Sequence, residues 1–205
     1  CKVADNKIVA FWTNGSAEGW CRVGTVASGE ITFGTAVRVD GGYADSGLGP
    51  GSESICFDAA SGKVVLAWWE WDGNGSDKLM VRTGTVSGTD ITLGTAYQVI
   101  AFATNTSAKV SVVYDENIQK SILYYKRRDT TMSNNPYKLF AKLGTISGTN
   151  ISFGTEKLIE APNTNYSFNR GPNNVFSHAC CSTYVSDASV KKTLVIRAGD
   201  TTTGQ

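Results

Sequence analysis

The hydrophobic residues of this chain fall in short runs that alternate with polar positions and are separated by Gly, Ser, Asn and Asp. In the middle of the chain, one run ends at Asp58 and the next begins at Lys63. A third run extends from Lys78 to Thr85, and a fourth from Ile91 to Val99. Runs of β-branched and aromatic residues bounded by turn residues are typical of strands, and no long segment has helical spacing. The pattern therefore predicts an all-β chain.

The strand pattern repeats along the chain. Three segments match almost letter for letter, at an offset of 60 residues both times (84 − 24 and 144 − 84): 24–35, 84–95 and 144–155. Strand-like runs led by a lysine also recur, at Lys7, Lys63, Lys120 and Lys192. The repeat predicts that the third and fourth strands of each unit form equivalent hairpins, with Ile31, Ile91 and Ile151 buried at equivalent positions.

Four strands in about 60 residues are typical of a propeller blade, which must stack on neighbours because a lone sheet cannot bury both faces. We predict one repeat domain, 1–205, of tandem four-stranded antiparallel blades forming a partial or complete β-propeller. The alternative is a linear stack of β-units. We expect the chain to be a segment of a longer array, with the last unit incomplete. The predicted units are 1–49, 50–106, 107–172 and 173–205.

The repeat itself resembles a known type. The segment 84–95 reads Gly-Thr-Val-Ser-Gly-Thr-Asp-Ile-Thr-Leu-Gly-Thr, and Tyr114-Asp115 precedes Lys120 by a fixed spacing. This pattern resembles the propeller-type repeat arrays of phage tail-fibre-like proteins and of secreted adhesins of marine and aquatic microbes and viruses. The resemblance implies a surface-exposed attachment role, often toward glycans, and brings no catalytic motif. The cysteines of this chain depart from the phage-type repeats.

Charge and hydropathy exclude two classes of partner. The chain has 19 basic and 18 acidic residues, a formal net charge of +1, so no overall field attracts nucleic acid or an anionic membrane. No apolar run approaches the roughly 20 residues that a membrane helix needs. We therefore expect no nucleic-acid partner and no membrane insertion.

The cysteines predict an oxidising compartment. No C-x-x-C pair occurs among the five, so disulfides are favoured over a zinc site or a redox motif, and we predict at least one. Neighbours on a strand point to opposite faces, so Cys180 and Cys181 should have different partners. The alternative is buried free thiols in a cytosolic protein. The candidates are Cys1, Cys21, Cys56, Cys180 and Cys181.

Sequons for N-glycosylation are in mild excess over chance. Such sites sit on surface loops of secreted proteins. The candidates are Asn14, Asn74, Asn105, Asn150 and Asn165.

Candidates for chemistry are few. His178 is the sole histidine and reads as a strand entry, which leaves a catalytic triad or a histidine metal site without partners. Asp58 and Asp115 occupy equivalent positions before tight turns, where Asp bonds nearby backbone N–H groups, so we interpret them as structural. The loop oxygens of Asp72, Asn74 and Asp77 are a weak calcium candidate, since the spacing lacks the glycine and the glutamate of an EF-hand. We expect no cofactor.

Aromatic and basic residues are the candidates for binding. Exposed rings stack on sugars, and alternation leaves Trp68 facing the core, so Trp69, Trp71 and Tyr125 are the ligand-binding candidates. A second set contributes one positive charge per blade. It predicts either a solvated edge strand protected from aggregation or a surface for acidic polysaccharide. This set is Arg22, Arg82 and Lys142.

These features together predict a non-enzymatic structural or adhesive repeat protein located outside the cell, at a cell surface or on a virion surface. Its expected partners are glycans or cell-surface polysaccharide, and neighbouring chains or repeats of the same assembly, met through loops such as 71–77 and 129–136. A carbohydrate-binding lectin propeller is the alternative. A propeller glycoside hydrolase, with a carboxylate pair about 5–10 Å apart, is the third possibility.

Overall fold

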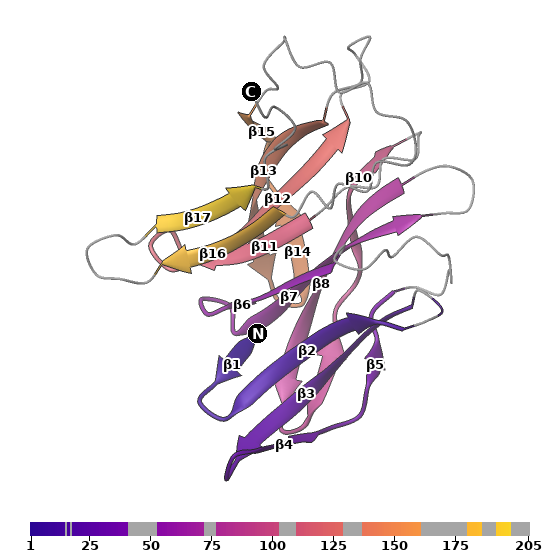
Figure 1. Cartoon of the computed structure of the whole chain (residues 1–205), viewed down its shortest axis with the longest axis vertical. Helices are drawn as coiled ribbons and strands as arrows, with labels where there is room; N and C mark the ends of the chain where they lie inside the picture. The colour runs from indigo at the N-terminus through magenta and orange to yellow at the C-terminus, as the bar shows by residue number, and fades with distance from the viewer. Residues whose placement is uncertain are drawn as a thin grey trace, which may run out of the picture.

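The strands of the chain form three antiparallel sheets and one further hairpin, as the computed structural model in Figure 1 shows. The structure describes residues 1–14, 16, 18–40, 53–71, 77–102, 110–128, 137–160, 180–185 and 192–197, with the backbone alone at several strand ends and throughout the last two segments. All of these residues lie in strands, turns or short connections, so the all-β prediction is confirmed.

Each of the three sheets is built from consecutive strands. Sheet 1 holds β1 (Lys2–Ala4), β2 (Lys7–Thr13), β3 (Gly19–Ala27), β4 (Glu30–Phe33) and β5 (Val37–Arg38). Sheet 2 holds β6 (Glu53–Asp58), β7 (Lys63–Trp71), β8 (Asp77–Ser87), β9 (Asp90–Leu93) and β10 (Tyr97–Phe102). Sheet 3 holds β11 (Val110–Asp115), β12 (Lys120–Arg128), β13 (Tyr137–Ser147), β14 (Asn150–Phe153) and β15 (Lys157–Glu160). The further hairpin holds β16 (Cys180–Val185) and β17 (Lys192–Arg197).

The outermost strand of each sheet is broken into two segments that pair with the same neighbour. In sheet 2, β9 and β10 both pair with β8, and the break falls at Gly94, whose N–H donates to the carbonyl of Thr83 at 2.9 Å. Gly34 and Gly154 make the same bond in sheets 1 and 3, to Val23 and Leu143. The predicted single strand from Ile91 to Val99 is therefore two short strands, β9 and β10, which lie one after the other along β8. Each sheet is thus four strands wide.

The hairpins β3–β4, β8–β9 and β13–β14 have the same register in the three sheets. Gly24, Gly84 and Gly144 pair with Phe33, Leu93 and Phe153 respectively. The lysine that begins the second strand bonds the threonine after that glycine in every sheet: Lys7 to Thr25 at 2.8 Å, Lys63 to Thr85 at 2.7 Å and Lys120 to Thr145 at 3.2 Å. The recurring lysine and Gly-Thr pair thus tie two neighbouring strands together at one end of each sheet.

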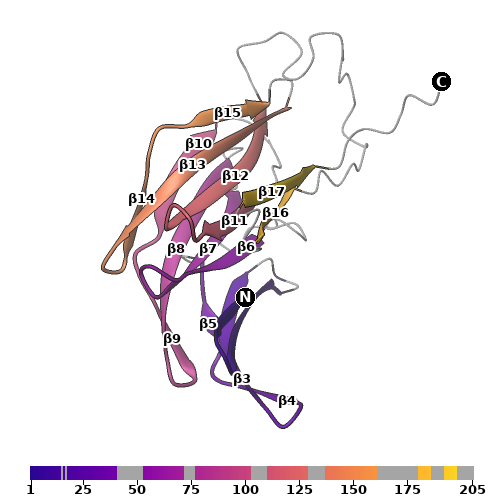
Figure 2. The same cartoon turned by 90° about the vertical axis from the view of Figure 1, so that its left-hand side faces the viewer.

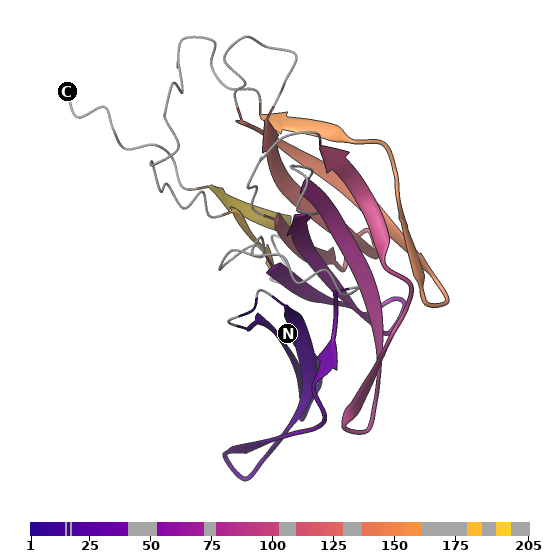
Figure 3. The ribbon, with the colours of Figure 1, turned by 90° about the vertical axis from the view of Figure 1, so that its right-hand side faces the viewer.

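The sheets stack on one another in chain order. The hairpins β3–β4, β8–β9 and β13–β14 lie in a row along one edge of the stack (Figures 2 and 3). In sheets 2 and 3, we call the face that packs on the preceding sheet the N-face and the opposite face the C-face. In sheet 1, the C-face is the one that packs on sheet 2, and the N-face is the other. The junction between sheets 1 and 2 buries Val9, Cys21, Val23 and Val39 of the C-face of sheet 1 against Val64, Leu66, Trp68 and Ile91 of sheet 2. Sheet 2 is therefore covered on both faces, because its other face packs on sheet 3.

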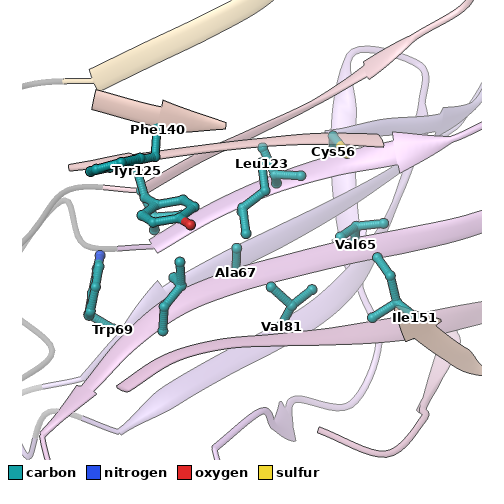
Figure 4. Close-up of a cluster of buried hydrophobic side chains, with 12 residues drawn as sticks. Cys56, Val65, Ala67, Trp69, Val81, Leu123, Tyr125, Phe140 and Ile151 are labelled. Atoms are coloured by element: carbon teal, nitrogen blue, oxygen red, sulfur yellow. The ribbon is translucent and has the colours of Figure 1, made fainter. Parts of the chain in front are cut away.

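The junction between sheets 2 and 3 contains the larger apolar cluster (Figure 4). Its fully buried side chains come from alternate positions of β7, β8 and β12, which is the period-two pattern of a strand. Burying these side chains stabilises the folded chain by about 25 cal/mol for each Å² of apolar surface removed from water. The cluster includes Val65, Ala67, Trp69, Leu79, Val81, Val110, Val112, Leu123, Tyr125, Phe140 and Ile151.

Polar contacts cross both junctions at equivalent places. Gly34 lies so close to the carbonyl oxygen of Thr89 that a Cβ there would overlap it, and Gly94 lies in the same way against Thr149. The Arg82 guanidinium donates to the carbonyl of Gly94 at 2.6 Å and, across the first junction, to that of Val39 at 2.7 Å. The hairpin turn of each later sheet thus sits on a glycine of the sheet before it.

The prediction that three equivalent isoleucines are buried is correct for two of them. Ile91 and Ile151 are each 4% exposed, whereas Ile31 is 48% exposed. Ile91 and Ile151 lie on N-faces that pack on a preceding sheet. In the described part of the chain, no sheet covers the N-face of sheet 1, so Ile31 is in contact with solvent.

The hairpin of β16 and β17 lies beside β11, and β16 also contacts β12 of sheet 3 (Figures 1 and 2). On the C-face of sheet 3, Val113, Ile122, Tyr124, Leu139 and Ala141 form a buried cluster. No helix in the described residues is long and apolar enough to cross a membrane.

Candidate functional site

The two binding candidates whose side chains the structure describes are buried between sheets. Trp69 is 3% exposed and Tyr125 is 0% exposed, and both belong to the cluster of Figure 4. Tyr125 donates from its hydroxyl to Glu156, which also accepts from Arg127 at 2.7 Å, and burial raises the pKa of Tyr125. Sheet 2 is covered by other sheets on both of its faces, so alternation along a strand does not leave one row of aromatic side chains exposed. Neither ring offers a surface to a sugar, which corrects the sequence-based choice of these two.

The loop candidates lie outside the described side chains. Only the backbone of Trp71 and Asp77 is described, and Asp72 and Asn74 are not described. His178 and the segment 129–136 are also outside the described residues. Among the described residues, no group of three or more His, Cys, Asp or Glu side chains could hold a metal ion. The calcium candidate therefore stays a prediction.

The recurring aspartates bond to their own turns. Asp58, 4% exposed, accepts from the Ser61 N–H at 3.0 Å and hydroxyl at 2.9 Å, and from the hydroxyl of Ser121 in sheet 3 at 2.8 Å. Asp115 accepts from the N–H of Asn117 at 2.9 Å. These are the turn-forming bonds that the sequence analysis expected of aspartate at this position.

The one-charge-per-sheet residues are not on an edge strand. Arg22, Arg82 and Lys142 lie on β3, β8 and β13, each of which is paired with strands on both sides. The Arg82 guanidinium donates hydrogen bonds to main-chain carbonyls of two sheets. The edge-strand interpretation is therefore wrong, and at Arg82 the charge holds two sheets together rather than facing a polysaccharide.

Two sequons and three cysteines fall on described side chains. Asn14 donates from its amide to Glu18 at 2.6 Å and accepts from the N–H of Ser16 and of Glu18, so its side chain is occupied by its own loop. Asn150 is exposed at the start of β14. The other sequons, Asn74, Asn105 and Asn165, lie outside the described residues.

The described cysteines, Cys1, Cys21 and Cys56, are free thiols. Of Cys180 and Cys181 only the backbone is described. The predicted disulfide is therefore untested for this pair and absent among the other three. Burial raises the pKa of Cys21 to about 11 and that of Cys56 to about 12, so both stay protonated and unreactive near neutral pH.

The surface with the strongest functional features is the N-face of sheet 1. We call it the outer face and define it by Trp12, Trp20, Arg22, Val26, Ile31 and Phe33, which the register places on one side of the sheet. Val26, Ile31 and Phe33 are 37%, 48% and 38% exposed, and both tryptophans are half-buried. The Arg22 guanidinium lies 4.0 Å from the centre of the Phe33 ring and 5.8 Å from that of Trp12. Such a contiguous apolar patch is a typical interaction surface.

A charged cluster borders the outer face at the end where β3 begins. Glu18 accepts from the Trp20 indole at 3.2 Å and pairs with Arg38 at 2.9 Å, and Arg38 also pairs with Asp40. The hydrogen bond from Asn14, followed by that from Trp20, lowers the pKa of Glu18. Asp40 in turn accepts from the N–H of Gly19 at 2.9 Å. The cluster holds the Trp20 ring in place on the face.

The outer face was missed from the sequence because its residues look like core. Trp12 occupies the position of Trp68 and Tyr125, which are 1% and 0% exposed in the two junctions. The only difference is whether another sheet lies against it, and residue type does not carry that information.

The chain was compared with protein-family models, with curated proteins and with solved structures, and none of the three comparisons gives a match.

Proposed function

We propose that this chain is a non-enzymatic structural or adhesive protein that acts outside the cell, as a fibre, surface-filament or attachment subunit. In this proposal the sheets are blades of a propeller-type array with a repeat of about 60 residues. The observation that carries it is the recurring junction, in which Thr89 sits on Gly34 and Thr149 sits on Gly94. A contact that recurs between successive units builds a rigid scaffold that can be extended.

The use of the polar side chains supports the non-enzymatic part of the proposal. Asp58 and Asp115 form turns, and Arg82 joins two sheets. An enzyme needs an acid, a base or a nucleophile directed at one place where a substrate can sit. These groups instead make structural bonds, and the turn-forming bonds of Asp58 and Asp115 recur from sheet 2 to sheet 3.

The position of the long connections supports an adhesive role. In sheet 2, Trp71 pairs with Asp77, which pairs with Phe102, so the connections 72–76 and 103–109 leave the same end of the sheet. The short turns at 58–63 and 87–90 are at the opposite end. In sheet 3, Arg128 pairs with Tyr137, so 129–136 leaves the corresponding end. We propose that glycans or partner chains contact this end, where repeated weak sites gain affinity through effective concentration.

A binding and turnover screen tests the proposal. The purified chain is applied to arrayed glycans and to cell-surface polysaccharides, and the same ligands are assayed for cleavage products. We expect binding without turnover, and stronger binding when the chain is displayed in several copies. Turnover that is lost when one carboxylate pair is changed would show an enzyme instead. A chain that binds none of the polysaccharides, even in multivalent form, would contradict the adhesive role.

A lectin is the second candidate, and the half-buried pair Trp12 and Trp20 on the outer face favours it. Aromatic rings beside polar groups are the usual way to hold a sugar ring, and Glu18 lies next to Trp20. A lectin should show ligand-dependent tryptophan fluorescence that Trp20→Ala removes. Tyr97→Ala, at an aromatic side chain of sheet 2 that is 38% exposed, is the matched control.

A further inference from the structure

The outer face carries an isoleucine and an arginine at the positions through which sheet 2 docks on sheet 1. At the first junction, Ile91 is buried, Arg82 reaches the Val39 carbonyl, and the turn at Thr89 rests on Gly34. The equivalent positions of sheet 1 are Ile31 and Arg22. The outer face therefore has, at these two positions, the residue types of the N-face at the first junction.

In sheet 1 these parts have no sheet to act on among the described residues. Ile31 is 48% exposed where Ile91 and Ile151 are 4% exposed. The Arg22 guanidinium rests on the Phe33 ring, whereas that of Arg82 binds a carbonyl of the preceding sheet. When no sheet packs on this face, the isoleucine stays exposed and the arginine contacts a ring of its own sheet instead.

Sheet 3 shows the same situation on its C-face. Leu143 is 48% exposed, while Val23 and Thr83, at the equivalent positions, are 0% and 1% exposed under the following sheet. Ile159 is 53% exposed, while Val39 is fully buried. A Cβ at Gly154 would meet only the carbonyl of Leu143, at 3.8 Å, where Gly34 and Gly94 each receive a turn. The C-face of sheet 3 is thus open at Leu143 and Ile159, although its cluster around Val113 and Tyr124 is buried.

We propose that the outer face is the docking surface for one further sheet of the same repeat, placed ahead of sheet 1. The partner sheet presents a C-face of small and β-branched side chains, like Val9, Cys21 and Val23. It has a main-chain carbonyl within reach of Arg22, as Val39 offers to Arg82. On docking, Ile31 becomes buried, Val26 and Phe33 become half-buried as Val86 and Leu93 are, and Arg22 turns from the Phe33 ring to that carbonyl.

One part of the junction differs in sheet 1. The turn of β3 and β4 has positive φ at both Ser28 and Gly29, whereas in the turns at 88 and 148 the glycine alone has it. The first is the type I′ pattern and the others fit type II′. Gly29 stands where Thr89 and Thr149 rest on a glycine of the preceding sheet. The turn of sheet 1 therefore lacks the threonine side chain of the other two, while its main-chain carbonyl at Gly29 stays available for the same contact.

The inference deepens the proposed repeat array and does not depend on glycan binding. The apolar character of Val26, Ile31 and Phe33 favours a sheet over a sugar, since sugars need polar partners beside each ring. The experiment below measures burial of the outer face, so its failure would leave the binding screen of the proposed function unaffected.

The test extends the full chain at its amino end by a second copy of residues 1–52, which is sheet 1 with the connection that normally leads to the next sheet. We expect hydrogen exchange of the β4 amides to slow by about tenfold or more in the original sheet 1, compared with the unextended chain. Ile31→Lys in the original sheet should then lower the unfolding midpoint strongly in the extended chain and little in the unextended one. Arg22→Ala should show the same dependence on the extension.

Ile118→Lys is the matched control, because Ile118 is 45% exposed in the turn between β11 and β12, which belong to sheet 3 and not to the outer face. Its effect should not change with the extension. Equal effects of Ile31→Lys in the two chains, or unchanged exchange in β4, would overturn the proposal. So would self-association of the unextended chain that Ile31→Lys abolishes, because the occupant would then be a second copy. Protection of the outer face by a soluble glycan alone would assign it to a sugar.

Discussion

The carbonyl oxygen of Thr89 lies directly against the Cα of Gly34, and the same contact recurs between Thr149 and Gly94. No side chain can stand at either glycine without moving the backbone of the next sheet. The contact accounts for glycine at positions 34 and 94, because glycine leaves room for the turn of the following sheet.

Gly94→Ala should destabilise the protein, because its Cβ would overlap the carbonyl of Thr149 and crowd the hydroxyl of Thr83. Overpacking of this kind costs about 1–3 kcal/mol. Gly154→Ala is the matched control, because its Cβ would meet only an ordinary contact at 3.8 Å, and we expect a change below about 0.5 kcal/mol. Urea unfolding of both variants measures the difference. Equal free energies of unfolding would mean that the turn does not rest on the glycine in solution.

The strands and the hairpin repeat could be predicted from the sequence because they depend on local patterns. Asp58 and Asp115 end strands before turns, and Gly24, Gly84 and Gly144 occupy one register. These features need only period-two alternation and turn chemistry. Closure into a propeller depends on sheets beyond these and stays a prediction.

The exposure of individual side chains could not be predicted, because it depends on the neighbouring sheet. Ile31 and Ile91 have nearly the same sequence context, yet one is exposed and the other buried. Alternation assigned Trp69 to solvent, but stacking on sheet 3 buries it. Arg82 was expected on an edge, but the split fourth strand puts β8 inside its sheet. For the exposure of Ile31 and Trp69 the missing information is which sheet packs where, whereas for Arg82 it is the pairing of strands within one sheet.

Arg82→Ala should weaken the first junction. It removes two charge-assisted bonds to the carbonyls of Gly94 and Val39, and we expect a loss of about 2–3 kcal/mol in the free energy of unfolding. Arg22→Ala, at the same position of sheet 1, removes a contact with aromatic rings and should cost only about 0.5–1 kcal/mol. Arg82→Lys should be intermediate, since an ammonium lacks the fork that reaches both oxygens. Similar losses for the two alanine variants would show that Arg82 does not join the sheets.

Ser121→Ala should break the bond that links the turn of sheet 2 to sheet 3. The Ser121 hydroxyl is 0% exposed and donates to Asp58 at 2.8 Å, so its removal leaves a buried carboxylate oxygen without that donor. We expect a loss of about 1–3 kcal/mol, measured by denaturant unfolding. Ser152→Ala, at an exposed hydroxyl with a 3.4 Å contact, is the control and should be close to neutral. A double-mutant cycle with Asp58→Asn should give a coupling of at least about 0.5 kcal/mol. Additive losses would mean that the two side chains act separately.

Alkaline pH should destabilise the protein through its buried thiols. Burial raises the pKa of Cys21 to about 11 and of Cys56 to about 12, above the ordinary thiol value of about 8.5. The folded state therefore favours the protonated thiols. Their contribution to stability is complete below the ordinary thiol pKa and is lost as pH rises toward the two raised values, because only the unfolded chain ionises in that interval. Tyr125, whose pKa burial also raises, acts in the same direction above its ordinary value.

The measurement is the free energy of unfolding between pH 7 and 11, together with alkylation of the native protein followed by mass spectrometry. Unfolding should become easier above about pH 9, and Cys21→Ala should make that decline less steep. In alkylation, the half-buried Cys1 should be modified well before Cys21 and Cys56, which are 0% and 8% exposed. Modification of all three at one rate in the folded protein would show that both junctions open readily, because Cys21 is buried between sheets 1 and 2 and Cys56 between sheets 2 and 3. The same spectra would report whether Cys180 and Cys181 are oxidised, and so would test the predicted disulfide at the two cysteines where it is still open.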